Sequence, residues 1–378
     1  MSEITRHPAS GDGEREGQNT GTRGRPTCAA RHLTRQVTVG GVSLGGDAPV
    51  RVQSMTCTRT GDAEATLQQI RELATAGAEF VRVTVNDDDA AAVLPRIVRE
   101  SNVPLVADIH FDHRLALAAV AAGVAKLRIN PGNIGSPDKV REVARAARDR
   151  GVPIRVGVNR GSLHRRYREQ RLVDPAGALV QSALDELEVL ASVDFHDVVV
   201  SLKSSEPQEV VQACRRFAEV SDVPQHLGVT EAGTLQAGIA RSVAAMSVLL
   251  GEGIGDTVRI SLAADPVEEV RAAFNMLQAL GLREGFARVV ACPTCGRVEV
   301  DVMKLAARVE ELARDLPPDR VISVMGCIVN GPGEAKSADL GIAAGRTKVA
   351  IYRRGELHRN VEKAELERVL MEEIERLR

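Results

Sequence analysis

The sequence is poor in aromatic residues. Only 2% of its 378 residues are aromatic, and tryptophan is absent. Recognition of single-stranded nucleic acid depends on aromatic side chains on which bases stack. The formal net charge of -2 also provides no overall positive field for a phosphate backbone. We therefore expect no nucleic-acid partner.

Long apolar runs are missing as well. A membrane-spanning helix needs about 18 or more consecutive apolar residues, and the chain has no such run. Residues 1–34 are rich in Gly, Arg, Thr and Glu and contain no apolar segment typical of a secretory signal. We expect these residues to form a disordered extension, and we expect a cytoplasmic protein that does not bind membranes.

Cysteine is scarce too, with six residues in the chain. That number is too small for a disulfide scaffold of this length, and clustered cysteines in a reducing compartment more often hold metal or perform redox chemistry. Cys57 and Cys214 are isolated, so we expect both to pack as small apolar residues. Cys292, Cys295 and Cys327 lie near one another in the last quarter of the chain.

Between about residues 48 and 285, short β-rich runs alternate with helical stretches rich in Ala and Leu. This alternation is typical of βα units around a parallel sheet. An open doubly wound sheet fits less well, because no glycine-rich dinucleotide-binding motif is present. Eight units in series predict a TIM (β/α)8 barrel over residues 35–286. The predicted strands are 50–55, 80–85, 105–110, 126–130, 154–158, 198–203, 225–229 and 257–262.

Polar side chains gather at the C-terminal ends of these strands, where barrel active sites are built. Cations at four of these ends would repel one another unless an anion, such as a diphosphate, neutralised them. The four cations are Arg82, Arg128, Lys203 and Arg259. The other residues expected to bind the ligand are His110, Asn130, Asn133, Asn159, Ser201, Ser204 and Ser261.

Three residues of the same rim are candidates for proton transfer: Asp108, His226 and Glu231. Imidazole and a partly desolvated carboxylate can be tuned to titrate near neutral pH. Glu231 follows the seventh predicted strand. A carboxylate among cations is either an ion-pair partner or an acid and base, and the sequence leaves both roles open.

The chain changes character after about residue 288, and residues 287–378 predict a small α+β domain. We expect a helix over 301–316, strands over 321–325, 340–343 and 348–352, and a terminal helix. Cys292 and Cys295 form a Cys-x-x-Cys turn, and Cys327 lies in a second glycine-rich loop. Three soft ligands can meet there.

Three kinds of site compete for these thiols. A structural zinc site needs four ligands, and this domain has no fourth cysteine and only His358 besides. A thioredoxin-like pair leaves Cys327 without a role. An iron-sulfur cluster explains all three cysteines, with Glu334 as a candidate oxygen ligand, although spacing alone slightly favours an exposed loop carboxylate for Glu334.

Seven motifs, in order, resemble the bacterial 4-hydroxy-3-methylbut-2-enyl diphosphate synthase family. The resemblance extends from about residue 35 to the end of the chain, and seven motifs are far more specific than a single Cys-x-x-Cys. The motifs are VQSMT (52–56), ADIHF (107–111), RINPGN (128–133), HLGVTEAG (226–233), GIGDT (253–257), CPTCGR (292–297) and MGCIVNGPGE (325–334).

The resemblance implies a reductase of isoprenoid biosynthesis. It implies two-electron reduction of 2-C-methyl-D-erythritol 2,4-cyclodiphosphate, with ring opening and loss of water, to (E)-4-hydroxy-3-methylbut-2-enyl diphosphate. It also implies one 4Fe-4S cluster per chain on Cys292, Cys295, Cys327 and Glu334, in a domain like those of ferredoxins and sulfite reductases. Reduced flavodoxin or ferredoxin would supply electrons. Family members form head-to-tail homodimers in which the cluster domain of one subunit covers the barrel of the other.

Two other functions stay open at this point. One is a TIM-barrel transferase for a phosphorylated or pterin ligand, with a structural zinc in its C-terminal tail. The other is a cluster carrier or sensor without catalytic activity, for which the polar rim would be unnecessary.

Overall fold

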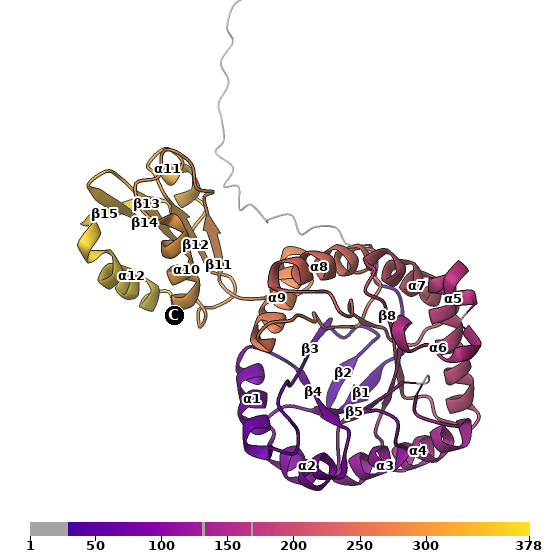
Figure 1. The fold of residues 1–378 in the computed structure, drawn as a ribbon. Helices are drawn as coiled ribbons and strands as arrows, with labels where there is room; N and C mark the ends of the chain where they lie inside the picture. Colours follow the sequence, from indigo (N-terminus) through magenta and orange to yellow (C-terminus); the bar gives the residue numbers. More distant parts are fainter. Residues whose placement is uncertain (1–28, 131–132, 168) are drawn as a thin grey trace, which may run out of the picture.

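The computed structural model describes residues 29–130, 133–167 and 169–378. A ring of helices surrounds a closed set of strands, and a smaller C-terminal domain follows the last helix of the ring (Figure 1). The predicted architecture of a TIM barrel followed by a small α+β domain is confirmed. None of the helices in the described ranges has the length and apolar character needed to cross a membrane.

Eight parallel strands form the barrel. Their order is β8-β7-β6-β5-β4-β3-β10-β9, and a bridge between Val200 and Gln225 joins the two end strands. Strands β9 and β10 are shorter than predicted, and the chain beyond them keeps single hydrogen bonds such as that from the Arg259 N–H to the Leu227 carbonyl. The strands are β3 (Arg51–Met55), β4 (Phe80–Val85), β5 (Leu105–Ile109), β6 (Lys126–Ile129), β7 (Ile154–Asn159), β8 (Val198–Lys203), β9 (His226–Leu227) and β10 (Thr257–Val258).

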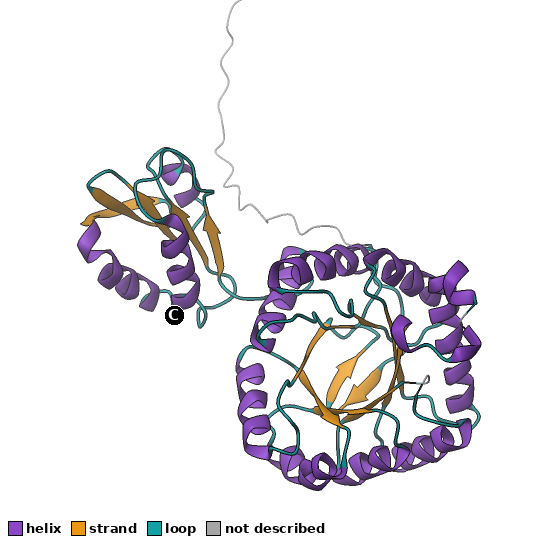
Figure 2. Ribbon diagram, viewed as in Figure 1, coloured by secondary structure: helices purple, strands orange, loops and turns teal. Residues whose placement is uncertain are grey.

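Helices cover the outside of the barrel (Figure 2). Asp side chains cap the N-termini of several of them, as Asp62 does by accepting a hydrogen bond from the Ala65 N–H. Val, Leu, Ile and Ala fill most of the layer between helices and strands, which explains how the chain folds with few aromatic residues. The helices are α1 (Ala63–Thr75), α2 (Asp88–Glu100), α3 (His113–Ala122), α4 (Pro137–Asp149), α5 (Gln170–Val173), α6 (Pro175–Ala191), α7 (Pro207–Val220), α8 (Leu235–Gly251) and α9 (Pro266–Ala279), with short 3-10 turns at Arg160–Ser162 and Arg165–Tyr167.

An N-terminal hairpin, which we did not predict, closes the bottom of the barrel. It consists of β1 (Val37–Val39) and β2 (Val42–Leu44), and its turn contains Gly40 and Gly41, both with positive φ. Its buried side chains pack against Phe80, Val106 and Val199, which lie near the N-terminal ends of their strands. Figure 1 shows the hairpin within the ring of strands. The floor of the barrel is therefore apolar and sealed.

Residues 29–34, which we placed in the N-terminal extension, lie against the barrel. The Ala29 N–H donates to the Gly251 carbonyl, and the His32 N–H donates to the Gly253 carbonyl. The Arg31 guanidinium pairs with Asp256 at 2.8 Å. The rest of the predicted extension, residues 1–28, lies outside the described residues.

The C-terminal domain has a five-stranded sheet in the order β11-β12-β13-β14-β15. Strands β11, β12 and β13 are parallel, whereas β14 and β15 are antiparallel to their neighbours. Helices α10 and α12 pack on the sheet in one apolar core. We predicted β12, β13 and β14 but not β11 or β15. The elements are β11 (Arg288–Ala291), α10 (Val302–Leu312), β12 (Val321–Met325), α11 (Gly331–Ala335), β13 (Leu340–Ala344), β14 (Lys348–Arg353), β15 (Glu356–Glu362), a 3-10 turn (Lys363–Glu365) and α12 (Leu366–Glu375).

Candidate active site

The interior of the barrel is charged. Side chains alternate along a strand, and in β4 the residues Val81, Val83 and Val85 pack in the apolar layer beneath the helices. The alternate positions face inward and carry polar groups, where most TIM barrels have layers of branched apolar residues. Buried polar residues at these positions are Gln53, Asp108, Lys126, Arg128, Arg155, Ser201, Lys203, His226 and Thr257.

Asp108 lies at the centre of a group of cations. Arg128 Nη1 donates to Asp108 Oδ1 at 3.0 Å, Arg82 Nε lies 3.6 Å from Oδ2, and His110 Nε2 lies 3.4 Å from Oδ2. Burial alone would raise the pKa of Asp108, but the charge of Arg82, the hydrogen bond with His110 and the charge of Arg128 bring this pKa well below its usual range. Asp108 is therefore ionised and fixes Arg82 and Arg128.

Arg259 is held by a carboxylate that the sequence analysis missed. Arg259 Nη2 lies 3.1 Å from Glu269 Oε2, and the Leu262 N–H donates to Glu269 Oε1 at 2.9 Å. Glu269 belongs to α9 and is 4% exposed. An acidic residue on the side of a helix that packs against the barrel could have drawn attention to Glu269. Only the fold, however, shows that its carboxylate reaches Arg259.

Two glycines make room for the cations. A Cβ atom at Gly157 would lie 2.4 Å from Arg128 Nε, and one at Gly228 would lie 2.6 Å from Lys203 Nζ. Among the described residues, Lys203 has no carboxylate within ion-pair distance. Burial and then the charges of Arg155 and Arg259 lower the pKa of Lys203 well below its usual value. The site therefore holds more cationic groups than carboxylates.

His226 lies deep in the barrel rather than at its rim. It is fully buried, and its Nδ1 lies 2.7 Å from Thr257 Oγ1. Burial and then the charge of Arg155 lower its pKa well below the usual value, so the ring is neutral at physiological pH.

Glu231 lies at the rim. It is exposed, and its φ of 53° lies in the left-handed region, which is uncommon outside glycine. A cavity of about 570 Å³ brings Glu231 together with Asn159. The same cavity is lined by Arg160 and Arg171, which we had not singled out, and by Gly161, Ser162, Leu172, Ser205 and Thr230.

The predicted amide and hydroxyl ligands have different surroundings. Asn130 Nδ2 donates to Ser162 Oγ at 2.7 Å, and Ser204 Oγ donates to Glu209 Oε2. Asn133 Oδ1 is buried and has no hydrogen-bond partner within the described part of the chain. Ser201 is buried in β8, and Ser261 is partly exposed after β10.

The three cysteines line one cavity of about 90 Å³ in the C-terminal domain. Strands β11 and β12 are parallel neighbours, and Ala291 is paired with Val324, so the loops that follow the two strands meet at the same edge of the sheet. The Gly326 N–H donates to Cys292 Sγ at 3.2 Å. Other residues of this cavity are Pro293, Arg297, Val298, Met325 and Asn330.

The described lining of this cavity offers three thiols, with no histidine and no fourth cysteine. Across the described residues, no three His, Cys, Asp or Glu side chains lie close enough together to hold one metal ion. A structural zinc site needs four Cys or His ligands, whereas an iron-sulfur cluster is held mainly by Cys thiolates, so the three thiols suit a cluster better than a zinc ion. Glu334 is exposed on α11, and Asn330 rather than Glu334 lines the cavity.

The isolated cysteines differ from each other. Cys214 is buried in α7, as predicted. The prediction for Cys57 is wrong, because Cys57 is exposed in the loop after β3, where Gln69 Nε2 donates to its Sγ at 3.0 Å.

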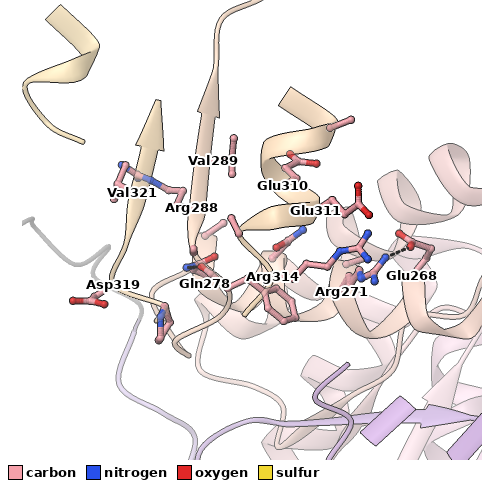
Figure 3. A pocket seen from close by; sticks show the side chains of 18 of the residues that line it. Glu268, Arg271, Gln278, Arg288, Val289, Glu310, Glu311, Arg314, Asp319 and Val321 are labelled. Atoms are coloured by element: carbon pink, nitrogen blue, oxygen red, sulfur yellow. Dashed lines mark hydrogen bonds and ion pairs between the residues drawn. The ribbon is translucent and has the colours of Figure 1, made fainter. Parts of the chain in front are cut away.

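A larger cavity of about 1070 Å³ lies between α9 and the C-terminal domain. Figure 3 shows carboxylates and guanidinium groups side by side there, including the ion pair between Glu268 and Arg271. Charges of both signs neutralise each other in this cavity, and none of the predicted site residues lines it. It therefore lacks the excess of positive charge found inside the barrel.

Family comparisons cover both domains. Residues 34–274 match the GcpE TIM-barrel domain, and residues 288–376 match the GcpE protein C-terminal domain. The break between the two matches covers the end of α9 and the segment that joins it to β11.

Curated relatives match nearly the full chain. A protein of Acidothermus cellulolyticus is 49% identical over 92% of this chain and 90% of its own length, and one of Geobacillus kaustophilus is 46% identical over 92% and 93%. A Salinispora tropica protein is 49% identical over 93% and 90%. All three are named 4-hydroxy-3-methylbut-2-en-1-yl diphosphate synthase (flavodoxin). The chain belongs to the GcpE family.

Proposed function

We propose that this chain is a 4-hydroxy-3-methylbut-2-enyl diphosphate synthase. It reduces 2-C-methyl-D-erythritol 2,4-cyclodiphosphate to (E)-4-hydroxy-3-methylbut-2-enyl diphosphate in the methylerythritol phosphate pathway. The observation that carries this proposal is the set of cations inside the barrel, namely Arg82, Arg128, Lys203 and Arg259. The chain is also 46% to 49% identical to relatives of that name. The name of the relatives favours this reductase over the transferase and the cluster carrier.

The barrel binds the diphosphate. Asp108 orients Arg82 and Arg128, and Glu269 orients Arg259. Arg82 also donates to Met55 Sδ, and Arg128 Nη2 also donates to the Gly157 carbonyl, so phosphate oxygens bind the N–H groups that these bonds leave or replace the weaker of them. Lys203 adds an amine whose charged form the bound anion favours. The remaining proposed contacts come from His110, Asn130, Asn133, Asn159, Ser201, Ser204 and Ser261.

Proton transfer is assigned to the rim. The reaction adds two electrons, breaks a carbon–oxygen bond of the ring and releases a hydroxyl as water, so one oxygen must be protonated as it leaves. Glu231 is exposed and can exchange protons with solvent, which makes it the proposed proton donor. Asp108 stays ionised and His226 stays neutral. We therefore assign positioning roles to Asp108 and His226, which we had expected to be catalytic.

The C-terminal domain holds one 4Fe-4S cluster per chain. Cys292, Cys295 and Cys327 are its proposed thiolate ligands, and the N–H bond from Gly326 to Cys292 Sγ is typical of cluster thiolates. Glu334 is the proposed fourth ligand, which requires its exposed side chain to turn toward the cavity. When bound, the cluster supplies the two electrons, one at a time.

The electron donor, the assembly and the location form part of the same proposal. Reduced flavodoxin is the proposed donor because the relatives carry that word in their name, and ferredoxin is the alternative.

Figure 1 shows the domain with the cysteines beside the ring of barrel helices rather than over the strands. We therefore propose a head-to-tail homodimer, in which that domain covers the barrel of a partner, located in the cytoplasm. Light scattering that gives the mass of a single chain would contradict the dimer.

Anaerobic purification followed by iron, sulfide and zinc analysis and a turnover assay tests the function. The assay supplies the cyclic diphosphate with a reduced flavodoxin. We expect about four irons and four sulfides per chain and formation of the linear diphosphate. Stoichiometric zinc, no colour and no product would instead support the transferase.

A further inference from the structure

Lys126 is a buried amine that the proposed function does not use. It is the first residue of β6 and 0% exposed, and its Nζ lies 4.9 Å from the centre of the Phe80 ring. Within the part of the chain that the structure describes, this Nζ has no hydrogen-bond partner. A buried polar group without a partner is uncommon in folded proteins.

Cations from two other strands of the barrel lie near this amine. Arg82 of β4 and Arg155 of β7 act on it electrostatically, and Lys126 in turn acts on His226 of β9. Among the described residues, no carboxylate lies within ion-pair distance of Lys126. Burial, then the charge of Arg155 and then that of Arg82, lower the pKa of Lys126 well below its usual value.

The surrounding layer contains other donors without acceptors. Gln53 Nε2, Arg155 Nε and His226 Nε2 are buried and unpartnered within the described ranges. Arg155 is 1% exposed, and among the described residues its side chain makes one hydrogen bond, from Nη1 to Gln53 Oε1 at 3.4 Å. This layer lies between the sealed apolar floor and the proposed diphosphate site, so an anion bound above it acts on the layer through a medium of low polarity.

The charge balance of the barrel assigns a role to the amine. Arg82, Arg128, Arg155 and Arg259 carry four positive charges, and Asp108 and Glu269 carry two negative charges, which leaves an excess of two positive charges without any lysine. A cyclic diphosphate carries two negative charges. The guanidinium groups match these two charges. The anion also favours the charged form of a buried amine below it, so a group that is neutral in the empty site can gain a proton when the ligand binds and add no repulsion beforehand.

We infer that Lys126 is such a group: its amine is uncharged in the free enzyme and takes up a proton from solvent when a diphosphate occupies the barrel. The step forms one N–H bond and breaks none in the ligand. The proton returns to solvent when the product leaves. Lys126 is thus a positioning residue for charge, and its role rests on the proposed function.

Calorimetric titration of the holoenzyme with 2-C-methyl-D-erythritol 2,4-cyclodiphosphate tests the inference. The titration is done without an electron donor, so that no turnover occurs, in buffers that differ in ionisation enthalpy. Each phosphorus of this ligand has one ester bond, one anhydride bond and one strongly acidic oxygen, so the ligand does not titrate near neutral pH. A buffer-dependent heat therefore reports protons exchanged by the protein. The test variants are Lys126→Met and, as a second replacement, Lys126→Gln. The control is Lys304→Met, because the Lys304 side chain is 88% exposed.

We expect the wild type and Lys304→Met to take up protons on binding, and Lys126→Met to take up about one fewer. The affinity of the wild type for the ligand should rise as the pH falls. In Lys126→Met, the slope of log affinity against pH should be smaller by about one decade per pH unit. Lys203 accounts for any uptake that remains. Equal uptake in the wild type and both Lys126 variants would overturn the inference, and the proposed function would stand if the wild type still turned the ligand over. No binding and no turnover would overturn both.

Discussion

The barrel interior and the cysteine cavity are built in opposite ways. In the barrel, charged side chains extend from buried strands and are fixed by buried carboxylates, as Arg128 is by Asp108. In the C-terminal domain, Cys295 is exposed and Cys292 and Cys327 are only partly buried, on two loops at the edge of a sheet. The first region is organised by its own carboxylates, whereas the second would be completed by the proposed cluster.

This difference predicts that the two regions respond differently to substitution. A change in the barrel should alter both ligand affinity and folding stability, because its charges are buried and mutually dependent. A change in the cysteine loops should abolish electron transfer and leave the barrel intact. The predictions below run from the largest expected effect to the smallest.

Cys327→Ser should separate the two regions most sharply. Loss of one thiolate removes a cluster ligand, so iron and sulfide content and turnover should fall to background. The barrel should still bind the cyclic diphosphate with wild-type affinity, measured by calorimetry. Lost ligand binding in a folded Cys327→Ser protein would show that the two regions are not independent.

Gly157→Ala should impair the barrel and spare the cluster. The added Cβ would lie 2.4 Å from Arg128 Nε and must displace the guanidinium. Loss of one charge-assisted hydrogen bond should raise KM by about 10- to 100-fold. Gly251→Ala is the matched control, since a Cβ there meets nothing within 4 Å. Equal KM values for the two variants would mean that Arg128 does not contact the ligand.

Asp108→Asn should destabilise the barrel by about 3 kcal/mol, because two buried guanidinium groups lose their carboxylate. The folded-state pKa of Asp108 is held far below the unfolded value of about 4. Its contribution is therefore present above about pH 4 and is lost as the pH falls further. Urea denaturation at pH 7 and pH 3, followed by circular dichroism, should show a difference between wild type and variant that shrinks at the lower pH.

Glu186→Gln should have the smallest effect, and it should be stabilising. Burial raises the pKa of Glu186 to about 7, with Asp185 adding to the rise and Arg166 opposing it. The protonated carboxyl contributes stability below the unfolded pKa of about 4.3, and this contribution is lost as the pH rises through 7. At pH 8 the variant should exceed the wild type by on the order of 2 kcal/mol. The same denaturation assay at pH 5 should show a much smaller gain, and equal gains at both values would contradict the assignment.

The sequence predicted the barrel because hydrophobic runs and helices repeat regularly. Strands β4, β8 and β12 begin and end at the predicted residues. The hairpin β1–β2 was missed because its strands are three residues long, and β15 was missed because mostly exposed polar residues form it. Periodicity detects strands with a buried face, and neither segment offers enough of one.

The sequence predicted the cations near the mouth of the barrel but not the charged residues buried deeper in it. Arg82, Arg128, Lys203 and Arg259 were found because each lies near the end of a predicted strand. Lys126 and Arg155 were missed because they lie at or near the starts of their strands, where the apolar pattern of TIM barrels gives no reason to expect buried cations. Glu269 was missed because the sequence does not show which barrel residue a helix faces.

The central claim is that the barrel and the cluster domain perform two halves of one reaction, in a dimer where each active site takes one half from each subunit. Mixing two inactive variants tests it most directly: Cys327→Ser, which keeps its barrel, and Arg128→Met, which keeps its cluster. After dissociation and random reassociation, half of the dimers combine the two chains and have one complete site, so about a quarter of wild-type activity should return. If mixed dimers form but the mixture has no more activity than either variant alone, the account is contradicted.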